Sequence, residues 1–109
     1  MSKNFIEKGE VLEVTASQNI ASGSLVVIGS IAGVAISDIA QNESGAVQIY
    51  GVFSLTKAAL AINQGAKVYW DAVNNNVTTT VSTNVQIGVA AKAALLADAT
   101  VDVLLNVAN

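Results

Sequence analysis

Apolar and polar residues alternate in short runs along most of the chain. The clearest run is Gly-Ala-Lys-Val-Tyr-Trp-Asp at residues 65–71, in which Val68 and Trp70 fall on one side while Lys67, Tyr69 and Asp71 fall on the other. Gly65 before this run and three Asn residues at 74–76 after it are typical of turns. The pattern predicts a half-buried strand in which Trp70, the only Trp of the chain, is a large core residue.

Similar runs follow one another at short intervals. They predict further strands at residues 10–16, 25–28, 33–36, 46–55, 76–81, 85–91 and 100–107. Within 46–55 an apolar face includes Ile49 and Phe53, and Gly51 between them suggests a sharp bend. Many short strands bounded by Gly and Asn predict an all-β fold, a small β-barrel or sandwich, whose core includes Trp70, Val68, Phe53 and Ile49.

Two segments depart from this pattern. Residues 56–63 (Thr-Lys-Ala-Ala-Leu-Ala-Ile-Asn) are rich in helix-forming residues, and Thr56 could cap them, so we expect one short helix there. Residues 1–8 are polar apart from Phe5 and Ile6, which predicts an extended N-terminal arm. The expected organisation is therefore an arm at 1–8 and a single β-barrel domain at 9–109.

Parts of the first half of the chain recur in the second half. Gly23-x-x-Val26-x-Ile28 matches Gly65-x-x-Val68-x-Trp70, Gly33-Val34-Ala35 matches Gly88-Val89-Ala90, and Val47-x-Ile49 matches Val101-x-Val103. We interpret these matches as two similar β units, although the first strands fall out of register by one and chance similarity of Ala- and Val-rich strands is the alternative.

Comparison of the two units identifies an unusual apolar face. Leu25 and Val27 stand in the first unit where Lys67 and Tyr69 stand in the second. A strand that is apolar on both faces is buried on both faces, so Leu25 and Val27 must meet another element or another chain. The residues expected at an oligomer interface are Leu25, Val27, Tyr50 and Tyr69.

Composition also indicates association. Hydrophobic residues make up 52% of the chain and charged residues only 12%, about half the charged share of a typical soluble domain. A single domain of 109 residues with so few charges must expose apolar surface, which usually marks contacts with partners. The net charge of −3 would repel a phosphate backbone, so we expect no nucleic-acid partner.

Little in the sequence suggests chemistry. The chain has no Cys and no His, which excludes disulfides, thiolate nucleophiles, imidazole bases and the usual zinc sites. The carboxylate pairs Glu10/Glu13 and Asp98/Asp102 occupy polar strand positions, and no phosphate-binding loop is present. The apolar run 25–36 is too short and too interrupted by Gly to span a membrane. We expect neither an enzyme nor a cofactor.

Several segments together are similar to a known family. They are the opening run Met-Ser-Lys-Asn-Phe-Ile-Glu-Lys-Gly-Glu, Gly51-Val52-Phe53-x-Leu55-x-Lys57, the run 65–71 and Ile87-Gly88-Val89-Ala90. Their order resembles that of the phage capsid cement, or head decoration, proteins, which are often catalogued as a domain of unknown function or mislabelled as phage-associated RecA-like recombinases. The resemblance implies a trimer on the outside of an icosahedral head, found in the host cytoplasm during assembly, that stabilises contacts of the major capsid protein.

The arm is the expected contact with the shell. An apolar pair in a polar leader is costly to leave in water, and Gly9 gives the chain a pivot. We expect Asn4, Phe5 and Ile6 to bind the capsid by adding a strand to an exposed edge. The alternative function is a small β-barrel module that binds a peptide or small molecule, which requires a concave pocket with convergent polar groups.

Overall fold

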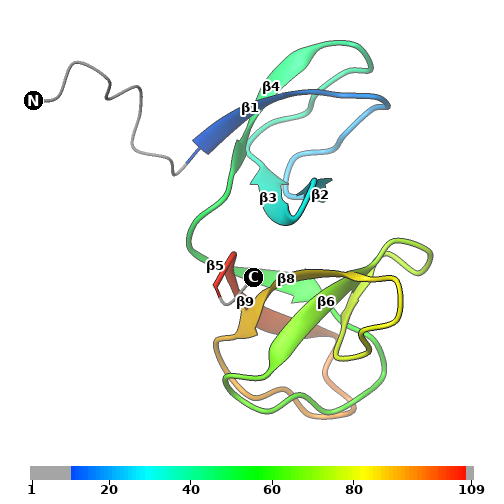
Figure 1. The fold of residues 1–109 in the computed structure, drawn as a ribbon, viewed down its shortest axis with the longest axis vertical. Coiled ribbons are helices and arrows are strands. Elements are labelled where there is room, and N and C mark those ends of the chain that lie inside the picture. The colour runs from blue at the N-terminus through cyan, green and yellow to red at the C-terminus, as the bar shows by residue number, and fades with distance from the viewer. Residues whose placement is uncertain (1–10, 108–109) are drawn as a thin grey trace, which may run out of the picture.

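The computed structural model describes residues 11–107, and every regular element in this range is a strand (Figure 1). The predicted all-β fold is confirmed. The strands are β1 (Val11–Thr15), β2 (Leu25–Ile28), β3 (Ile31–Ala35), β4 (Ser44–Gln48), β5 (Val52–Thr56), β6 (Lys67–Asp71), β7 (Asn76–Thr78), β8 (Val85–Ala90) and β9 (Thr100–Leu105).

The strands form two antiparallel sheets that occupy the two halves of the molecule in Figure 1. The first sheet has the order β1-β4-β3-β2 and the second has the order β5-β9-β8-β6-β7. Neither sheet is closed into a barrel, so of the two expected architectures a sandwich fits better than a barrel.

The two sheets repeat one topology, as the sequence predicts. If β7 is left out, the second order, β5-β9-β8-β6, reproduces the first with β5 in place of β1 and β9 in place of β4. Matching turns also carry matching hydrogen bonds, because the amides of Gly23 and Gly65 donate to Ala35 and Ala90, each over 2.8 Å. Both glycines have a positive φ, 84° and 81°, a conformation that glycine adopts at little cost. We refer to residues 11–48 as the first unit and to residues 52–107 as the second unit.

The strand register corrects two details of the predicted repeat. Ala35 pairs with Val47 and Ala90 pairs with Val103, so the counterpart of Val47 is Val103 rather than Val101. Because Leu12 pairs with Val47 and Phe53 with Val103, the first strands are in register after all. The offset of one residue seen in the sequence lies in the loops that follow these strands.

The predicted long strand at 46–55 is two strands in different sheets. β4 ends at Gln48 and β5 begins at Val52, and Gly51 between them has a φ of 124°. Apolar residues alternate with other residues in the same phase before and after Gly51, so the sequence pattern alone cannot show that residues 46–55 form two strands. Gly51 marks the point at which the chain leaves one sheet and enters the other.

The expected short helix at 56–63 is wrong, because residues 11–107 contain no helix. This segment instead pairs with distant parts of the second unit. The amide of Ala58 donates to Val77 over 2.7 Å, and Ile62 exchanges two hydrogen bonds with Ala94. A segment of this length gains too little from helix propensity to resist such pairing.

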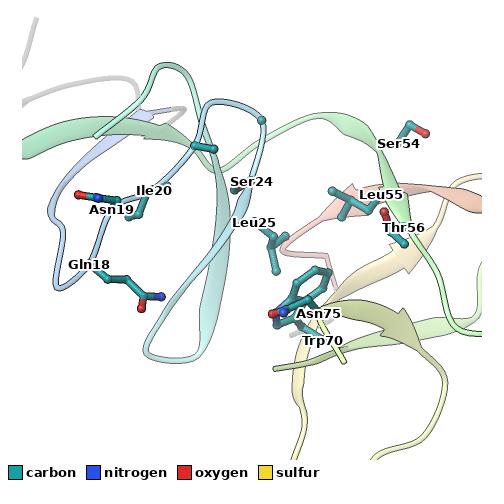
Figure 2. Close-up of a pocket in the computed structure, with 12 residues that line it drawn as sticks. Gln18, Asn19, Ile20, Ser24, Leu25, Ser54, Leu55, Thr56, Trp70 and Asn75 are labelled. Carbon is teal, nitrogen blue, oxygen red and sulfur yellow. The ribbon is translucent and has the colours of Figure 1, made fainter. Parts of the chain in front are cut away.

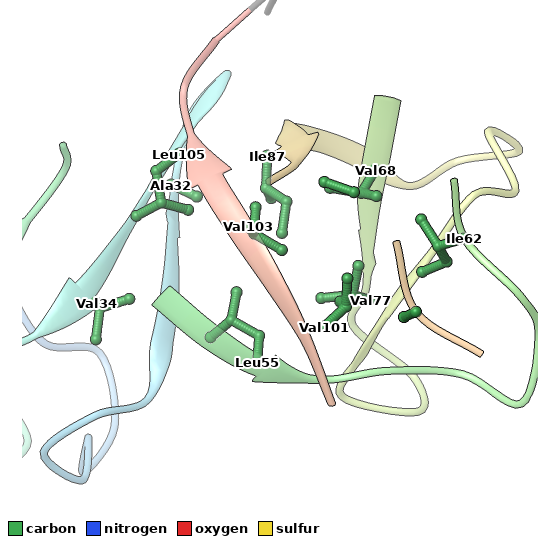
Figure 3. Packing of buried hydrophobic residues seen from close by; sticks show 12 residues of the cluster. Ala32, Val34, Leu55, Ile62, Val68, Val77, Ile87, Val101, Val103 and Leu105 are labelled. Carbon is green, nitrogen blue, oxygen red and sulfur yellow. The ribbon is translucent and has the colours of Figure 1, made fainter. Parts of the chain in front are cut away.

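The core consists of two clusters of buried side chains. The larger cluster lies in the second unit but includes Ala32 and Val34 of β3, which joins the two sheets (Figure 3). The smaller cluster lies within the first unit and contains Ala16, Ala35, Ile39 and Val47. The four residues expected in the core have different positions: Val68 is fully buried, Phe53 and Trp70 are half-buried against the larger cluster, and Ile49 is half-buried against the smaller one.

Asn106 adds a polar connection between the units. Its side-chain amide donates to the carbonyl oxygens of Ala32 and Ile49 over 2.8 and 2.6 Å, and its side-chain oxygen accepts from the amide of Ala32 over 2.9 Å. Bonds to the backbone of β3 and of the segment after β4 hold the end of β9 against the first unit.

Candidate interaction surfaces

The described residues offer little for catalysis or metal binding. No group of three or more acidic, His or Cys side chains within residues 11–107 could hold a metal ion. Of the carboxylate pairs in the sequence, Glu10 lies outside the described residues, and Asp98 accepts a hydrogen bond from the amide of Leu95 over 2.8 Å in a local turn. No helix in this part of the chain is long and apolar enough to cross a membrane.

A groove of about 430 Å³ lies between the two units (Figure 2). The first unit contributes Leu25 of β2 and the loop before this strand, including Gln18 and Asn19, and the second unit contributes residues of β5, Trp70 and Asn75. No lining side chain is charged. The groove therefore offers amides, hydroxyls and the exposed part of one indole to any ligand.

An exposed apolar turn lies between β8 and β9. The side chains of Leu95 and Leu96 are 71% and 63% exposed. The turn is tightly closed, because the amide of Asp98 also donates to the carbonyl of Leu95 over 3.0 Å. Sequence analysis did not select these residues, although two adjacent Leu residues in an Ala-rich segment are a visible signal.

Lys57 holds this turn from inside the molecule. The side chain is only 6% exposed, and its Nζ donates to the carbonyl oxygens of Leu60 (2.7 Å), Ala58 (3.1 Å) and Leu96 (3.4 Å). Main-chain carbonyls from two separate segments therefore meet at one ammonium group. We infer that Lys57 fixes the position from which Leu95 and Leu96 are displayed.

Asp71 ends β6 in a well-bonded turn. Hydrogen bonds from the side chain and then the amide of Asn74, together with the amide of Val73, hold the pKa of Asp71 below its ordinary value, while partial desolvation opposes them. These bonds stabilise the carboxylate as a turn acceptor. They give it no partner with which to exchange a proton.

Comparison with known proteins identifies the family of this chain. The family model of the phage cement proteins matches residues 6–105, nearly the whole chain. The chain belongs to the phage cement protein family. No curated protein and no solved structure matches it. Membership gives the protein a structural role in the phage capsid and a place in the virion, in agreement with the resemblance found in the sequence.

The residues expected at an oligomer interface of this cement protein differ in how far they are exposed. Leu25 is half-buried and packs against the larger core cluster, so its apolar face meets the second unit of the same chain. Val27 is 39% exposed and Tyr50 61% exposed, whereas Tyr69 is half-buried. Val27 and Tyr50 thus stay available for contacts with other chains.

The arm of the cement protein lies outside the described residues, and with it the expected capsid-binding residues Asn4, Phe5 and Ile6. The assignment of residues 1–8 to an arm and 9–109 to one domain stays a prediction.

Proposed function

We propose that this cement protein binds the outer surface of an icosahedral phage head as a trimer and stabilises contacts between subunits of the major capsid protein. The family match over residues 6–105 carries the proposal. The surface of the protein supports it, since Val27, Tyr50, Leu95 and Leu96 are apolar side chains with large exposed fractions on a chain that has few charges.

The physical demands of such a role agree with the fold. A cement protein requires a rigid body and apolar surfaces that match a partner, not an active site. Contacts that are weak singly become strong when many linked contacts act together on one shell. We further propose that the arm makes the capsid contact, with Asn4, Phe5 and Ile6 adding a strand to an exposed edge of the shell.

The test is decoration of heads that lack this protein. Purified protein is mixed with such heads, and bound copies are counted after sedimentation and located by electron microscopy. We expect saturable binding at threefold positions and a higher temperature of DNA release from decorated heads. Serine in place of both Phe5 and Ile6 should lower the amount bound, whereas the matched change Ser2→Ala should not. Failure of the wild-type protein to bind would contradict the proposed function.

A binding module is the second candidate, and the inter-unit groove is the observation that favours it. Its volume of about 430 Å³ falls within the range of small-molecule sites. Because Trp70 is the only Trp and lines the groove, a bound ligand should change the fluorescence of the protein. Titration with neutral saccharides and short uncharged peptides, with no change in emission at any concentration, would eliminate this candidate.

A further inference from the structure

β7 is the one strand of the second unit that has no counterpart in the first. Residues 72–84, which include β7, connect β6 to β8, whereas only Gly29 and Ser30 connect β2 to β3. β7 pairs with β6 antiparallel, with Val77 opposite Trp70. Val77 also forms a parallel bridge with Lys57, just after β5, and its side chain is fully buried. β7 thus fills the space between β6 and the end of β5.

The same space in the first unit is open. β1 and β2 are the outer strands of the first sheet, and each pairs with a single neighbour among the described strands. A groove of about 400 Å³, which we call the seam, lies along them and is lined by residues 13–17, Ile20 and residues 26–28. Its apolar lining includes Val14, Val26 and Ile28, all half-buried against the smaller core cluster.

Backbone hydrogen bonds show that the seam corresponds to the site of β7. The amide of Ala16 donates to Glu43 before β4, and the amide of Lys57 donates to Ala99 before β9, so Ala16 is the counterpart of Lys57. Ile28 is the counterpart of Trp70, because each stands five residues after an equivalent glycine, Gly23 or Gly65. The two residues that Val77 joins in the second unit therefore have their counterparts on the seam.

The second unit also defines what the seam would accept. By analogy with β7, the occupant is an extended strand, antiparallel to β2 and parallel to β1, with a β-branched apolar side chain at the position of Val77. Residues 11–50 carry three charged side chains, Glu13, Asp38 and Glu43, and all are acidic. An occupant with Lys residues beside its apolar side chain would complement this charge.

The arm has these properties. Residues 3–8 read Lys-Asn-Phe-Ile-Glu-Lys, an apolar pair between two Lys residues. The arm of the same chain cannot reach the seam in the required direction, because four residues separate Ile6 from Val11 at the start of β1. A parallel partner needs a crossover connection of about a dozen residues. A second copy of the chain has no such restriction.

We propose that, in the free protein, the arm of one copy lies in the seam of a second copy. Ile6 takes the position of Val77 beside Ile28, and Glu7 lies opposite Val27, as Thr78 lies opposite Tyr69 in the second unit. When each copy donates its arm to the next, the copies form a ring if the rotation between neighbours closes. The proposal requires no head and does not depend on the proposed function. On a head, the arm exchanges these main-chain hydrogen bonds for those of the shell edge.

Disulfide trapping tests the contact directly, because the natural chain has no Cys. One chain carries Glu7→Cys and a second, larger tagged chain carries Val27→Cys; the two are mixed and oxidised. Directly opposite residues of paired strands have Cα atoms about 4.5–5.5 Å apart, within the range of a disulfide. The matched control replaces Val27→Cys with Val73→Cys, which is on an exposed turn after β6.

We expect a mixed cross-link between the two chains that is several-fold more abundant than in the control. A chain that carries both Glu7→Cys and Val27→Cys should form cross-linked multimers. Cross-linking only within single chains would show that a chain binds its own arm, and a yield equal to that of the control would show that the seam has no arm bound. Either result overturns the proposal.

A binding measurement provides an independent test. A labelled peptide of residues 1–9 is titrated into the full-length protein that carries Ile6→Ser in its own arm, with no heads present. We expect saturable binding, and a peptide with Ile6→Ser should bind about tenfold or more weakly, the loss expected for one buried apolar side chain. Equal affinity of the two peptides would contradict the assignment of Ile6 to the seam. Because no head is present in either experiment, their failure would leave decoration of heads unaffected.

Discussion

Gly88 shows how much one residue can determine in this fold. Its φ is 151°, and a Cβ built on it would fall on the carbonyl oxygen of Leu104 in the neighbouring strand. At this point the pairing of β6 with β8 shifts, since Val68 faces Gly88 while Tyr69 faces Gln86. A glycine at this position allows the bulge in β8 and the close approach of β9 together.

Gly88→Ala should therefore be severe. We expect a loss of roughly 2–5 kcal/mol in the free energy of unfolding, from overpacking and from strained backbone. Gly29→Ala is the matched control, because Gly29 has a φ of 60° but nothing within 4 Å of an added Cβ. It should lose about 1–2 kcal/mol, the cost of a left-handed conformation alone. Urea denaturation measures the free energy of unfolding of both variants. Equal losses in the two variants would show that the close approach of Gly88 to Leu104 is unimportant.

Asp71 is a single residue that should make the stability of the protein depend on pH. Because its folded pKa lies below the ordinary value, its ionised form favours the folded state above the unfolded pKa, and this contribution disappears as the pH falls through the folded pKa. Asn74→Ala should raise the pKa of Asp71, since the side chain of Asn74 is the largest cause of the shift. Titration of the carboxyl carbon by NMR measures this change. An unchanged pKa would remove Asn74 as the cause.

At the scale of elements, the alternation of apolar and polar residues was sufficient to predict where most strands lie, because this alternation can be read from neighbouring residues. Which strands pair with one another depends on residues far apart in the sequence. The helix expected at 56–63 fails because the amides of Ala58 and Ile62 find partners at Val77 and Ala94. The repeat was predictable because Gly23 and Gly65 mark the same turn. The burial of Lys57 was not predictable from the sequence, because one of its three carbonyl partners belongs to Leu96, which is far away in the sequence.

Lys57 links the segment that follows β5 to the turn that contains Leu96, and its replacement should loosen both together. Lys57→Met keeps the apolar stem and removes the ammonium group, which leaves the carbonyls of Ala58, Leu60 and Leu96 without this donor. We expect a loss of roughly 1–3 kcal/mol in unfolding free energy and faster hydrogen exchange in the turn at 95–98. Lys92→Met, at an exposed position, is the control. Unchanged exchange at 95–98 would separate Lys57 from the display of Leu95 and Leu96.

At the scale of the whole molecule, a charged residue should separate folding from assembly. Val27 is partly exposed on the seam, whereas Val26 packs against the smaller core cluster. Val27→Asp should therefore weaken the oligomer at micromolar concentration while the melting temperature of the chain stays nearly constant. Val26→Asp should lower the melting temperature sharply, since it buries a charge. Analytical ultracentrifugation and calorimetry together measure the two effects.

The control for this prediction is Val73→Asp, because Val73 is 89% exposed and lies away from the seam. It should change neither assembly nor stability. A wild-type protein that sediments as a monomer would contradict association itself, and equal behaviour of Val27→Asp and Val73→Asp would move the interface elsewhere. The sequence could select Val27 by comparing the two units, but the seam beside it required the positions of β1, β2 and β7 in space.

The hydrogen bonds of Asn106 also bear on how this protein ages. Asparagine side chains hydrolyse slowly to aspartate, and the product at this position would keep an oxygen for the amide of Ala32. It would lose both donations, to Ala32 and to Ile49, and would set a negative charge beside two carbonyl oxygens. The stability of the fold during long storage would then depend on the chemical lifetime of a single amide in every copy of the protein.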